Sequence, residues 1–170
     1  MNKKNIFAVL LCLMIATGAS AQEYLKWSVE IKYDSVQSLD GKYFAVKDNG
    51  KCVIKDDVTK IMDKVIGSDI VVWATPIYYY EMSGQMKVLI DRLNPMFSMD
   101  YKFRDVYFLA TAAEDGEHVY EKALSGLNGW IDCFDKAKLK GCVFCGGVTI
   151  GGEISDNTKL KEAYDMGTGV

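Results

Sequence analysis

The sequence predicts a single α/β domain with a parallel sheet and helices on both faces of that sheet. Short apolar runs alternate along the chain with segments that have helical spacing. Helices of ten or more residues between strands allow crossover connections, and such connections make neighbouring strands parallel. The chain has 170 residues and is 49% hydrophobic, which is enough apolar material for one core.

Four strands are predicted from runs that are rich in β-branched and aromatic residues. They cover Val29 to Tyr33, Asp69 to Ala74, Asp105 to Ala112 and Leu139 to Val148. The second run has Ile-Val-Val-Trp at its centre, and an apolar run of this kind is typical of a strand that is buried on both faces.

Four helices are predicted from apolar residues at helical spacing. They cover residues 56–67, 83–94, 117–134 and 157–166. Asp56 or Asp57 can cap the first helix, and Gly67 ends it. Ser83 is the expected N-cap of the second helix, and Asn94-Pro95 ends it.

The first 21 residues differ from the rest and predict an export signal. Lys3 and Lys4 precede an apolar run from Ile6 to Ile15, and Ala19-Ser20-Ala21 supplies the small residues that a signal peptidase prefers. We therefore expect residues 1–21 to be a signal peptide and residues 22–170 to form the single domain, with the first strand of the sheet degenerate or absent. The protein is then expected to be periplasmic or secreted, without a stable membrane span. In the alternative, Ile6 to Met14 is the central strand of the sheet, and the protein is cytoplasmic.

Charge and composition exclude several classes of function. The net charge is −3 and the chain lacks a basic run, so no nucleic-acid partner is expected. His118 is the sole histidine and is expected at the surface, so the sequence predicts no metal site. It also has no nucleophile elbow, Walker loop or dinucleotide-binding glycine motif, and no catalytic side chain is predicted.

The stretch from Thr75 to Arg92 leads from a buried strand through three consecutive tyrosines into a capped helix. Its motifs, together with one earlier motif and several later ones in the family's order, resemble those of flavodoxin-like NAD(P)H-dependent FMN oxidoreductases, a group that includes FMN reductases and iron-sulfur flavoproteins. The motifs are Gly50 to Asp57, Thr75 to Tyr78, Ser83 to Lys87, Ile90 to Arg92, Tyr101 to Arg104, Ala110 to Ala113, Gly129 to Phe134 and Lys161 to Tyr164.

The resemblance implies a flavodoxin-like fold, FMN as cofactor and NAD(P)H as electron donor. In sheets of this kind the ligand lies beyond the carboxyl ends of the strands, where the loop after Ala74 opens. The expected flavin contacts come from that loop, from the start of the next helix, and from a second wall after the following strand. They are Thr75, Pro76, Ile77, Tyr78, Tyr79, Met82, Ser83, Gly84, Thr111, Ala112 and Ala113.

The sequence departs from the family's pattern in two places. The N-terminal loop that holds the FMN phosphate in the family has no counterpart before Val29, so the phosphate loses charge-assisted hydrogen bonds of about 1.5 to 3 kcal/mol each. Of the cysteine cluster found in iron-sulfur members only Cys52 remains, and one thiolate does not hold a cluster. Cys142 and Cys145 have redox-motif spacing but lie in a predicted strand, which favours two buried core thiols.

Two functional hypotheses follow. In the first, the protein is an FMN-binding oxidoreductase that transfers electrons from NAD(P)H to a quinone, a flavin or a similar small acceptor. In the second, it is a degenerate exported flavodoxin-like protein without activity that acts as a binding or interaction module. The family resemblance also implies a homodimer or a higher homo-oligomer, with the helix of Lys87, Asp91 and Arg92 near a subunit contact. The simplest interpretation of those three charges is a solvated helix face.

Overall fold

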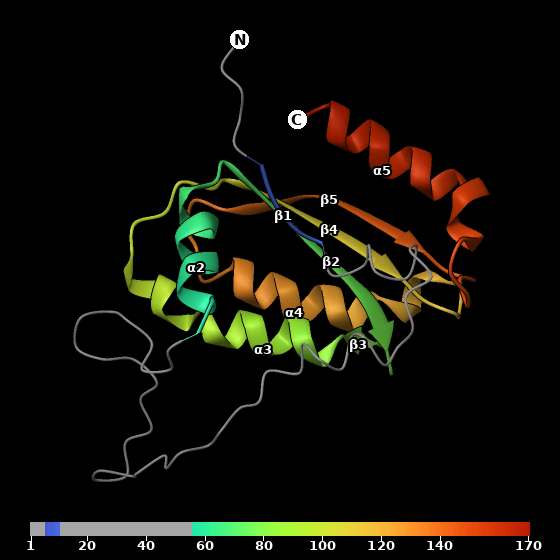
Figure 1. Ribbon diagram of the computed structural model, residues 1–170, viewed down its shortest axis with the longest axis horizontal. Helices are drawn as coiled ribbons and strands as arrows, with labels where there is room; N and C mark the ends of the chain where they lie inside the picture. Colours follow the sequence, from blue (N-terminus) through green and yellow to red (C-terminus); the bar gives the residue numbers. More distant parts are fainter. Residues whose placement is uncertain (1–5, 11–55) are drawn as a thin grey trace, which may run out of the picture.

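The computed structural model describes residues 6–10 and 56–170 (Figure 1). The strand predicted at Val29 to Tyr33 and the residue Cys52 lie outside the described residues, as does most of the segment from Met1 to Ala21. No helix within the described ranges has the length and apolar character that a membrane crossing requires.

The centre of the fold is a parallel sheet with the strand order β1-β2-β4-β5. These strands are Ile6–Leu10, Ile70–Tyr78, Asp105–Thr111 and Lys138–Cys145. A short fifth strand, β3 (Glu81–Met82), pairs antiparallel with the end of β2. The parallel sheet predicted from the crossover helices is therefore confirmed.

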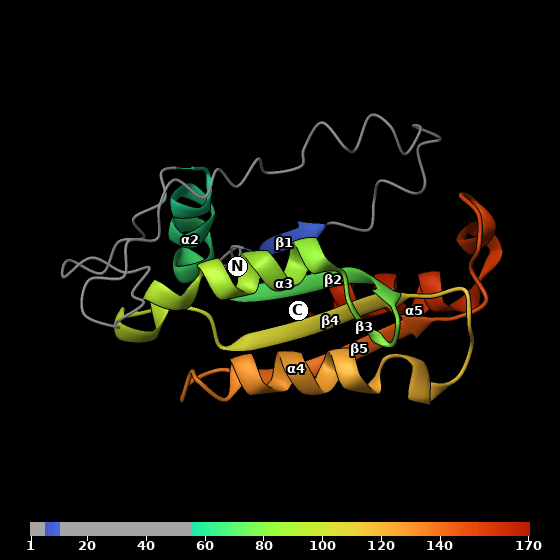
Figure 2. The same ribbon diagram turned by 90° about the horizontal axis from the view of Figure 1, so that it is seen from below.

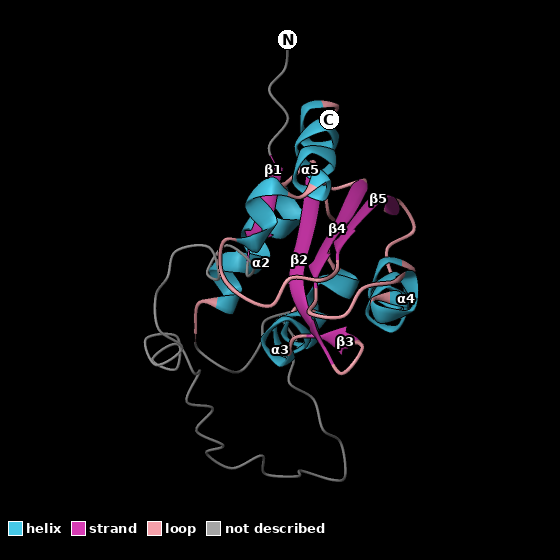
Figure 3. Ribbon diagram, turned by 90° about the vertical axis from the view of Figure 1, so that its right-hand side faces the viewer, coloured by secondary structure: helices cyan, strands magenta, loops and turns pink. Residues whose placement is uncertain are grey.

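Within the described residues, four α-helices pack around the sheet. They are α2 (Val58–Gly67), α3 (Gly84–Arg92), α4 (Glu121–Ile131) and α5 (Thr158–Thr168). Short 3-10 helices lie at Asn94–Ser98 (η3), Glu117–Val119 (η4) and Glu153–Asp156 (η5). Figures 1 and 2 show α3 and α4 on one face of the sheet and α5 on the opposite face, and Figure 3 shows the same layers end-on.

The main core lies between the sheet and the two helices α3 and α4. Trp73 of β2 and Phe108 of β4 are fully buried there, together with Leu127 of α4. The ring of Trp73 meets the edge of Trp130 with centroids 5.2 Å apart, and Trp130 stacks on Phe103 at 5.8 Å. Burial of large aromatic side chains dominates the packing energy of a core, so this cluster fixes α4 against the sheet.

The helix termini follow the predicted signals. The Ser83 hydroxyl accepts a hydrogen bond from the Met86 backbone N–H at 3.3 Å, which confirms Ser83 as the N-cap of α3. The Asp56 carboxylate accepts from the Val58 N–H at 3.0 Å, although Asp57 occupies the N-cap position of α2. Asn157 caps α5 by accepting from the Lys159 N–H at 2.9 Å.

Some element boundaries differ from the prediction. The strand predicted to end at Ala74 continues to Tyr78, because Ile77 and Tyr78 pair with β3. The helix predicted from Glu117 begins with the 3-10 turn η4, and its α-helical part begins at Glu121. The last strand ends at Cys145, where Gly146 and the left-handed Gly147 turn the chain.

The apolar run near the N-terminus contributes the first strand of the sheet. Ile6–Leu10 pairs in parallel with Ile70–Ala74, from Ile6 opposite Ile70 to Leu10 opposite Ala74. The strand alternative for Ile6 to Met14 predicts a strand in this run, and Ile6–Leu10 forms one. Among the described strands, however, β1 stands at the end of the order and not at its centre. The expectation of a degenerate or absent first strand is therefore wrong, and the prediction that residues 1–21 are cleaved on export stays a prediction.

Candidate functional site

The carboxyl ends of β2, β4 and β5 meet at one edge of the sheet. Pro76 of β2 lies opposite Thr111 of β4, and Thr111 lies opposite Cys145 of β5. Parallel strands with short loops beyond their carboxyl ends form the ligand-binding edge of open α/β sheets. The expected site residues come from the loops and strand ends at this edge.

The three consecutive tyrosines at the end of β2 lead into β3 through a tight hairpin turn. Tyr78 pairs with Glu81, so Tyr79 and Tyr80 are the two turn residues. Their φ angles are 53° and 66°, which are left-handed values that normally favour glycine, asparagine or aspartate. The expectation that Thr75 to Tyr78 form a loop is wrong, because these residues lie in β2.

The hairpin exposes its aromatic rings. Tyr79 is 97% exposed and Tyr78 is 57% exposed, so neighbouring apolar side chains do not cover these rings. Beside them, Gly84 begins α3 with open space over its Cα, and the first N–H groups of a helix favour negative charge. Flat side chains and a helix N-terminus are thus available to a ring that accepts electrons.

A buried hydroxyl holds the start of α3 against the end of β2. Thr75 is fully buried, and its Oγ1 accepts a hydrogen bond from the Ser83 N–H at 2.9 Å and donates one to the Pro76 carbonyl at 2.8 Å. Met82 is also buried and packs 3.5 Å from the position of a Cβ on Gly126 of α4. The hairpin therefore rests on three buried side chains that do not form part of its exposed surface. They are Thr75, Met82 and Ser83.

The second wall follows β4. The Ala112 N–H donates to the Cys145 carbonyl at 3.1 Å, and the Ala112 carbonyl accepts from the Val148 N–H at 2.9 Å. The backbone of Ala112 is thus used within the protein, and Ala113 is the exposed residue of this wall. The backbone of Gly146 packs closely against the residues that follow this wall, because a Cβ on Gly146 would lie only 2.6 Å from the Asp115 Cα.

Sequence reasoning missed the residues that join the two walls. The Tyr80 hydroxyl donates a hydrogen bond to the Glu114 carboxylate at 3.1 Å, and the other oxygen of Glu114 lies 2.9 Å from His118 Nε2. These contacts with His118 and Tyr80 hold the pKa of Glu114 below its ordinary value. The hydrogen bond to Glu114, together with the charge of that carboxylate, raises the pKa of Tyr80. The proximity of Tyr80 and Glu114, 34 residues apart, depends on tertiary structure and leaves no local sequence signal.

The two cysteines of β5 differ in their surroundings. Cys145 is buried, and Cys142 is half-buried against the core. Burial raises the pKa of the Cys142 thiol to about 11. Both are free thiols on opposite faces of one strand, so Cys145 fits the expectation of a buried core thiol, whereas Cys142 is buried only in part. Within residues 6–10 and 56–170, no three His, Cys, Asp or Glu side chains gather as a metal site would require.

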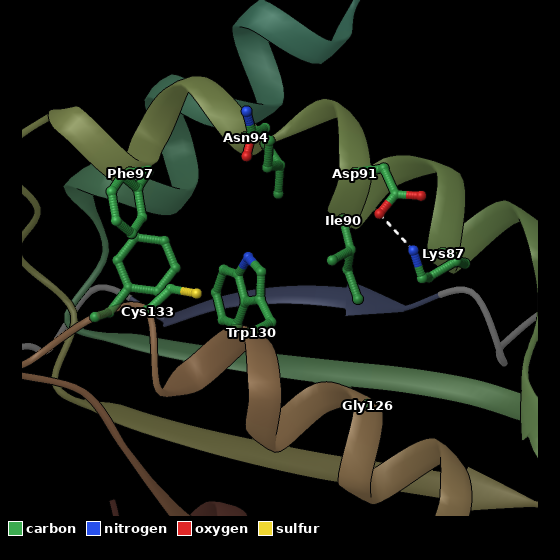
Figure 4. Close-up of a pocket in the computed structure, with 10 residues that line it drawn as sticks. Lys87, Ile90, Asp91, Asn94, Phe97, Gly126, Trp130 and Cys133 are labelled. Atoms are coloured by element: carbon green, nitrogen blue, oxygen red, sulfur yellow. Dashed lines mark hydrogen bonds and ion pairs between the residues drawn. The ribbon is translucent and has the colours of Figure 1, made fainter.

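A cavity of about 290 Å³ lies between α3, η3 and α4 (Figure 4). None of the residues expected to contact the flavin lines it. Its lining comprises Lys87, Ile90, Asp91, Leu93, Asn94, Phe97, Gly126, Trp130, Cys133 and Phe134. Lys87 and Asp91 pair with each other at its rim, as predicted for a solvated helix face, whereas Arg92 is largely buried and pairs with Asp56 at 2.8 Å.

Comparison with known proteins identifies the family. Residues 7–137 match the family of NADPH-dependent FMN reductases. The chain belongs to this family. This membership supports FMN as the cofactor and a reduced nicotinamide nucleotide as its electron donor.

Individual relatives match parts of the chain. An iron-sulfur flavoprotein of Methanocaldococcus jannaschii is 40% identical over 50 residues, which are 29% of this chain and 26% of that protein. An iron-sulfur flavoprotein of Archaeoglobus fulgidus is 44% identical over 46 residues, which are 27% of this chain and 21% of that protein. The chain thus matches about a quarter of the length of these two curated relatives.

The structural comparison shows the fold. The Trp repressor binding protein from Bacillus subtilis superposes with a TM-score of 0.55 and 24% identity, over 65% of this chain and 70% of that chain. This similarity confirms the flavodoxin-like α/β fold that the sequence predicts.

The described residues fit the ring of a flavin better than its phosphate. Tyr78, Tyr79, Gly84 and Ala113 present exposed surface at the ligand-binding edge, which suits a flat ring. By contrast, the backbone N–H groups of Ser83 and Ala112 already bond within the protein.

Proposed function

We propose that this protein is an FMN-dependent oxidoreductase that passes electrons from NAD(P)H to a quinone, a flavin or a similar small acceptor. The observation that carries the proposal is the exposed tyrosine hairpin at the carboxyl edge of the sheet, inside the region that matches the FMN reductase family. Bound FMN supplies the redox chemistry, so the side chains of the chain need to bind and orient the ring.

In the proposed complex, the isoalloxazine ring lies between the hairpin and the loop after β4. Tyr78 and Tyr79 stack on the ring or flank it, and Ala113 forms the opposite wall together with Thr111. The start of α3 at Gly84 stabilises negative charge on the reduced ring by about 0.3 to 1 kcal/mol when exposed. Thr75, Pro76, Ile77, Met82, Ser83 and Ala112 hold these elements in place.

The test of function is spectroscopic and kinetic. We expect the purified full-length chain to bind added FMN, seen as quenched flavin fluorescence, and to oxidise NADH or NADPH when FMN and a quinone are both present. Omission of FMN is the control and should abolish nucleotide oxidation. A protein that stays colourless and leaves flavin fluorescence unchanged would refute the enzyme and favour the role of a binding module.

We also propose that the protein forms a homodimer or a higher homo-oligomer through the surface of α3 and η3. Phe97 of η3 is 68% exposed and Val88 of α3 is 41% exposed, and the cavity between α3 and α4 adds further apolar lining. Light scattering should give at least twice the mass of the chain. The Phe97→Ser variant should dissociate, whereas Tyr164→Phe on α5 should not; a monomeric wild-type protein contradicts this proposal.

The cellular location is a further proposal. We propose that residues 1–21 direct export to the periplasm or the medium, on the basis of the positive residues, the apolar run and the small residues before Gln22. N-terminal sequencing of the native protein is the test. A mature start at Gln22 supports export, whereas a retained Met1 supports the alternative in which β1 is a permanent strand of a cytoplasmic protein.

A further inference from the structure

The turn at the tip of the hairpin has an unfavourable backbone. Tyr79 and Tyr80 both have positive φ angles, and for residues with a large side chain this region of conformational space is a genuine outlier. Such conformations persist when the surrounding contacts impose them, and they concentrate at functional sites. The contacts of these two tyrosines therefore indicate what holds the hairpin in place.

Tyr79 makes little contact with the protein, since it is 97% exposed. Tyr80 is 39% exposed, and its hydroxyl donates to the Glu114 carboxylate at 3.1 Å. The ammonium of Lys122 on α4 lies 5.4 Å from the centroid of the Tyr80 ring, at a distance suited to a cation–π interaction. Tyr80 is thus the residue that fastens the turn.

Glu114 is itself held in place. Its second oxygen lies 2.9 Å from His118 Nε2, and the rings of His118 and Tyr80 are 6.2 Å apart with an angle of 38° between their planes. A glutamate side chain is a carboxylate at neutral pH, and this charged form accepts the phenol hydrogen bond more strongly than a neutral acceptor would. The contacts with His118 and Tyr80 lower the pKa of Glu114 further. The four side chains of Tyr80, Glu114, His118 and Lys122 form one cluster, here called the tyrosine latch.

The latch joins the two proposed walls of the flavin site. Tyr80 directly follows Tyr79 of the first wall, and Glu114 directly follows Ala113 of the second wall. We propose that the tyrosine latch fixes the spacing of these walls, and that Tyr80 and Glu114 are positioning residues for the flavin ring. The role in flavin binding rests on the proposed function, whereas the tethering of the hairpin does not.

The first test measures the hairpin without flavin. In Tyr80→Phe the ring and its contact with Lys122 remain, and only the hydroxyl is lost. Amide hydrogen exchange in the segment from Tyr78 to Met82 should become about three- to tenfold faster than in the wild type, as expected for loss of one hydrogen bond. Tyr164→Phe removes the same oxygen from an exposed site on α5 and should leave this exchange unchanged.

The second test measures flavin affinity and uses rescue by a conservative variant. Glu114→Ala and Tyr80→Phe should each weaken FMN binding about three- to tenfold, and the double variant should be no weaker than either one alone. Glu114→Gln retains a side-chain oxygen and should stay within about twofold of the wild type. If the cluster only stabilises the fold, the variants should lower the free energy of unfolding, and Glu114→Gln should not restore FMN affinity relative to Glu114→Ala.

The exchange and affinity measurements test the tyrosine latch and the proposed function separately. Unchanged exchange in Tyr80→Phe overturns the latch. Faster exchange with unchanged FMN affinity overturns the positioning role. If the wild type does not bind FMN, the proposed function fails together with the positioning role, and the exchange measurement still decides whether Tyr80 tethers the hairpin.

Discussion

The buried hydroxyl of Thr75 offers a quantitative prediction about the base of the proposed site. The Thr75→Val substitution keeps the size and the branched shape of the side chain but removes its oxygen. The Ser83 N–H then loses its acceptor in a place where water has little access, because Ser83 is 1% exposed and Thr75 is fully buried. The hydrogen bond to the Pro76 carbonyl is lost as well.

A buried donor without a partner costs about 1 to 3 kcal/mol. We therefore expect Thr75→Val to lower the free energy of unfolding by that amount. With a urea m-value of about 2 kcal/mol per molar, the midpoint of unfolding should fall by about 0.5 to 1.5 M. The measurement is urea unfolding of the full chain, followed by circular dichroism and by tryptophan fluorescence.

Thr111→Val is the matched control for this substitution. Thr111 lies in the neighbouring strand β4 and is half-buried, so the exchange of a hydroxyl for a methyl group should change the midpoint by less than about 0.3 M. If Thr75→Val unfolds at the same urea concentration as Thr111→Val, then the Thr75 hydroxyl does not hold the start of α3, and the account of the hairpin's support is wrong.

Two other predictions concern regions outside the hairpin. Asp56→Ala removes one partner of the largely buried Arg92 and the carboxylate that accepts from the Val58 N–H, and should lower the free energy of unfolding by about 1 to 3 kcal/mol in thermal or urea unfolding. Asp57→Ala breaks an exposed pair with Lys60 and should lower it by less than about 1 kcal/mol. Equal losses in the two variants would contradict the assignment. Iodoacetamide at pH 8 should alkylate the exposed Cys133 well before Cys142, because a pKa of about 11 keeps the Cys142 thiol protonated at that pH. Peptide mass spectrometry measures the order of alkylation. Equal rates would show that Cys142 is more accessible than its burial indicates.

The regular elements were predictable because local signals specify them. Ser83 caps α3, Asn94-Pro95 ends it, and its buried residues Met86 and Ile90 lie at helical spacing. The apolar run around Trp73 forms the central strand β2. In each case the signal lies within a few residues of the structure that it specifies, so the element forms as predicted, although pairing with β3 extends β2 beyond its predicted end.

The details of the site were harder to predict because they depend on distant contacts. Three consecutive tyrosines have no propensity for a left-handed turn, and the bond from Tyr80 to Glu114 crosses between two loops. The sequence analysis therefore assigned Tyr78 and Tyr79 to the site and overlooked Tyr80. It also treated Arg92 as part of a solvated face, since nothing within its own helix indicates the partner Asp56 at the start of α2.

The central claim is that the flavin ring lies between the tyrosine hairpin and the loop after β4. Amide hydrogen exchange of the full chain with and without saturating FMN tests this location most directly. The account predicts slower exchange from Thr75 to Gly84 and from Thr111 to Ala113, and unchanged exchange around the cavity of Phe97 and Trp130. Protection confined to that cavity, or no protection anywhere, would contradict it.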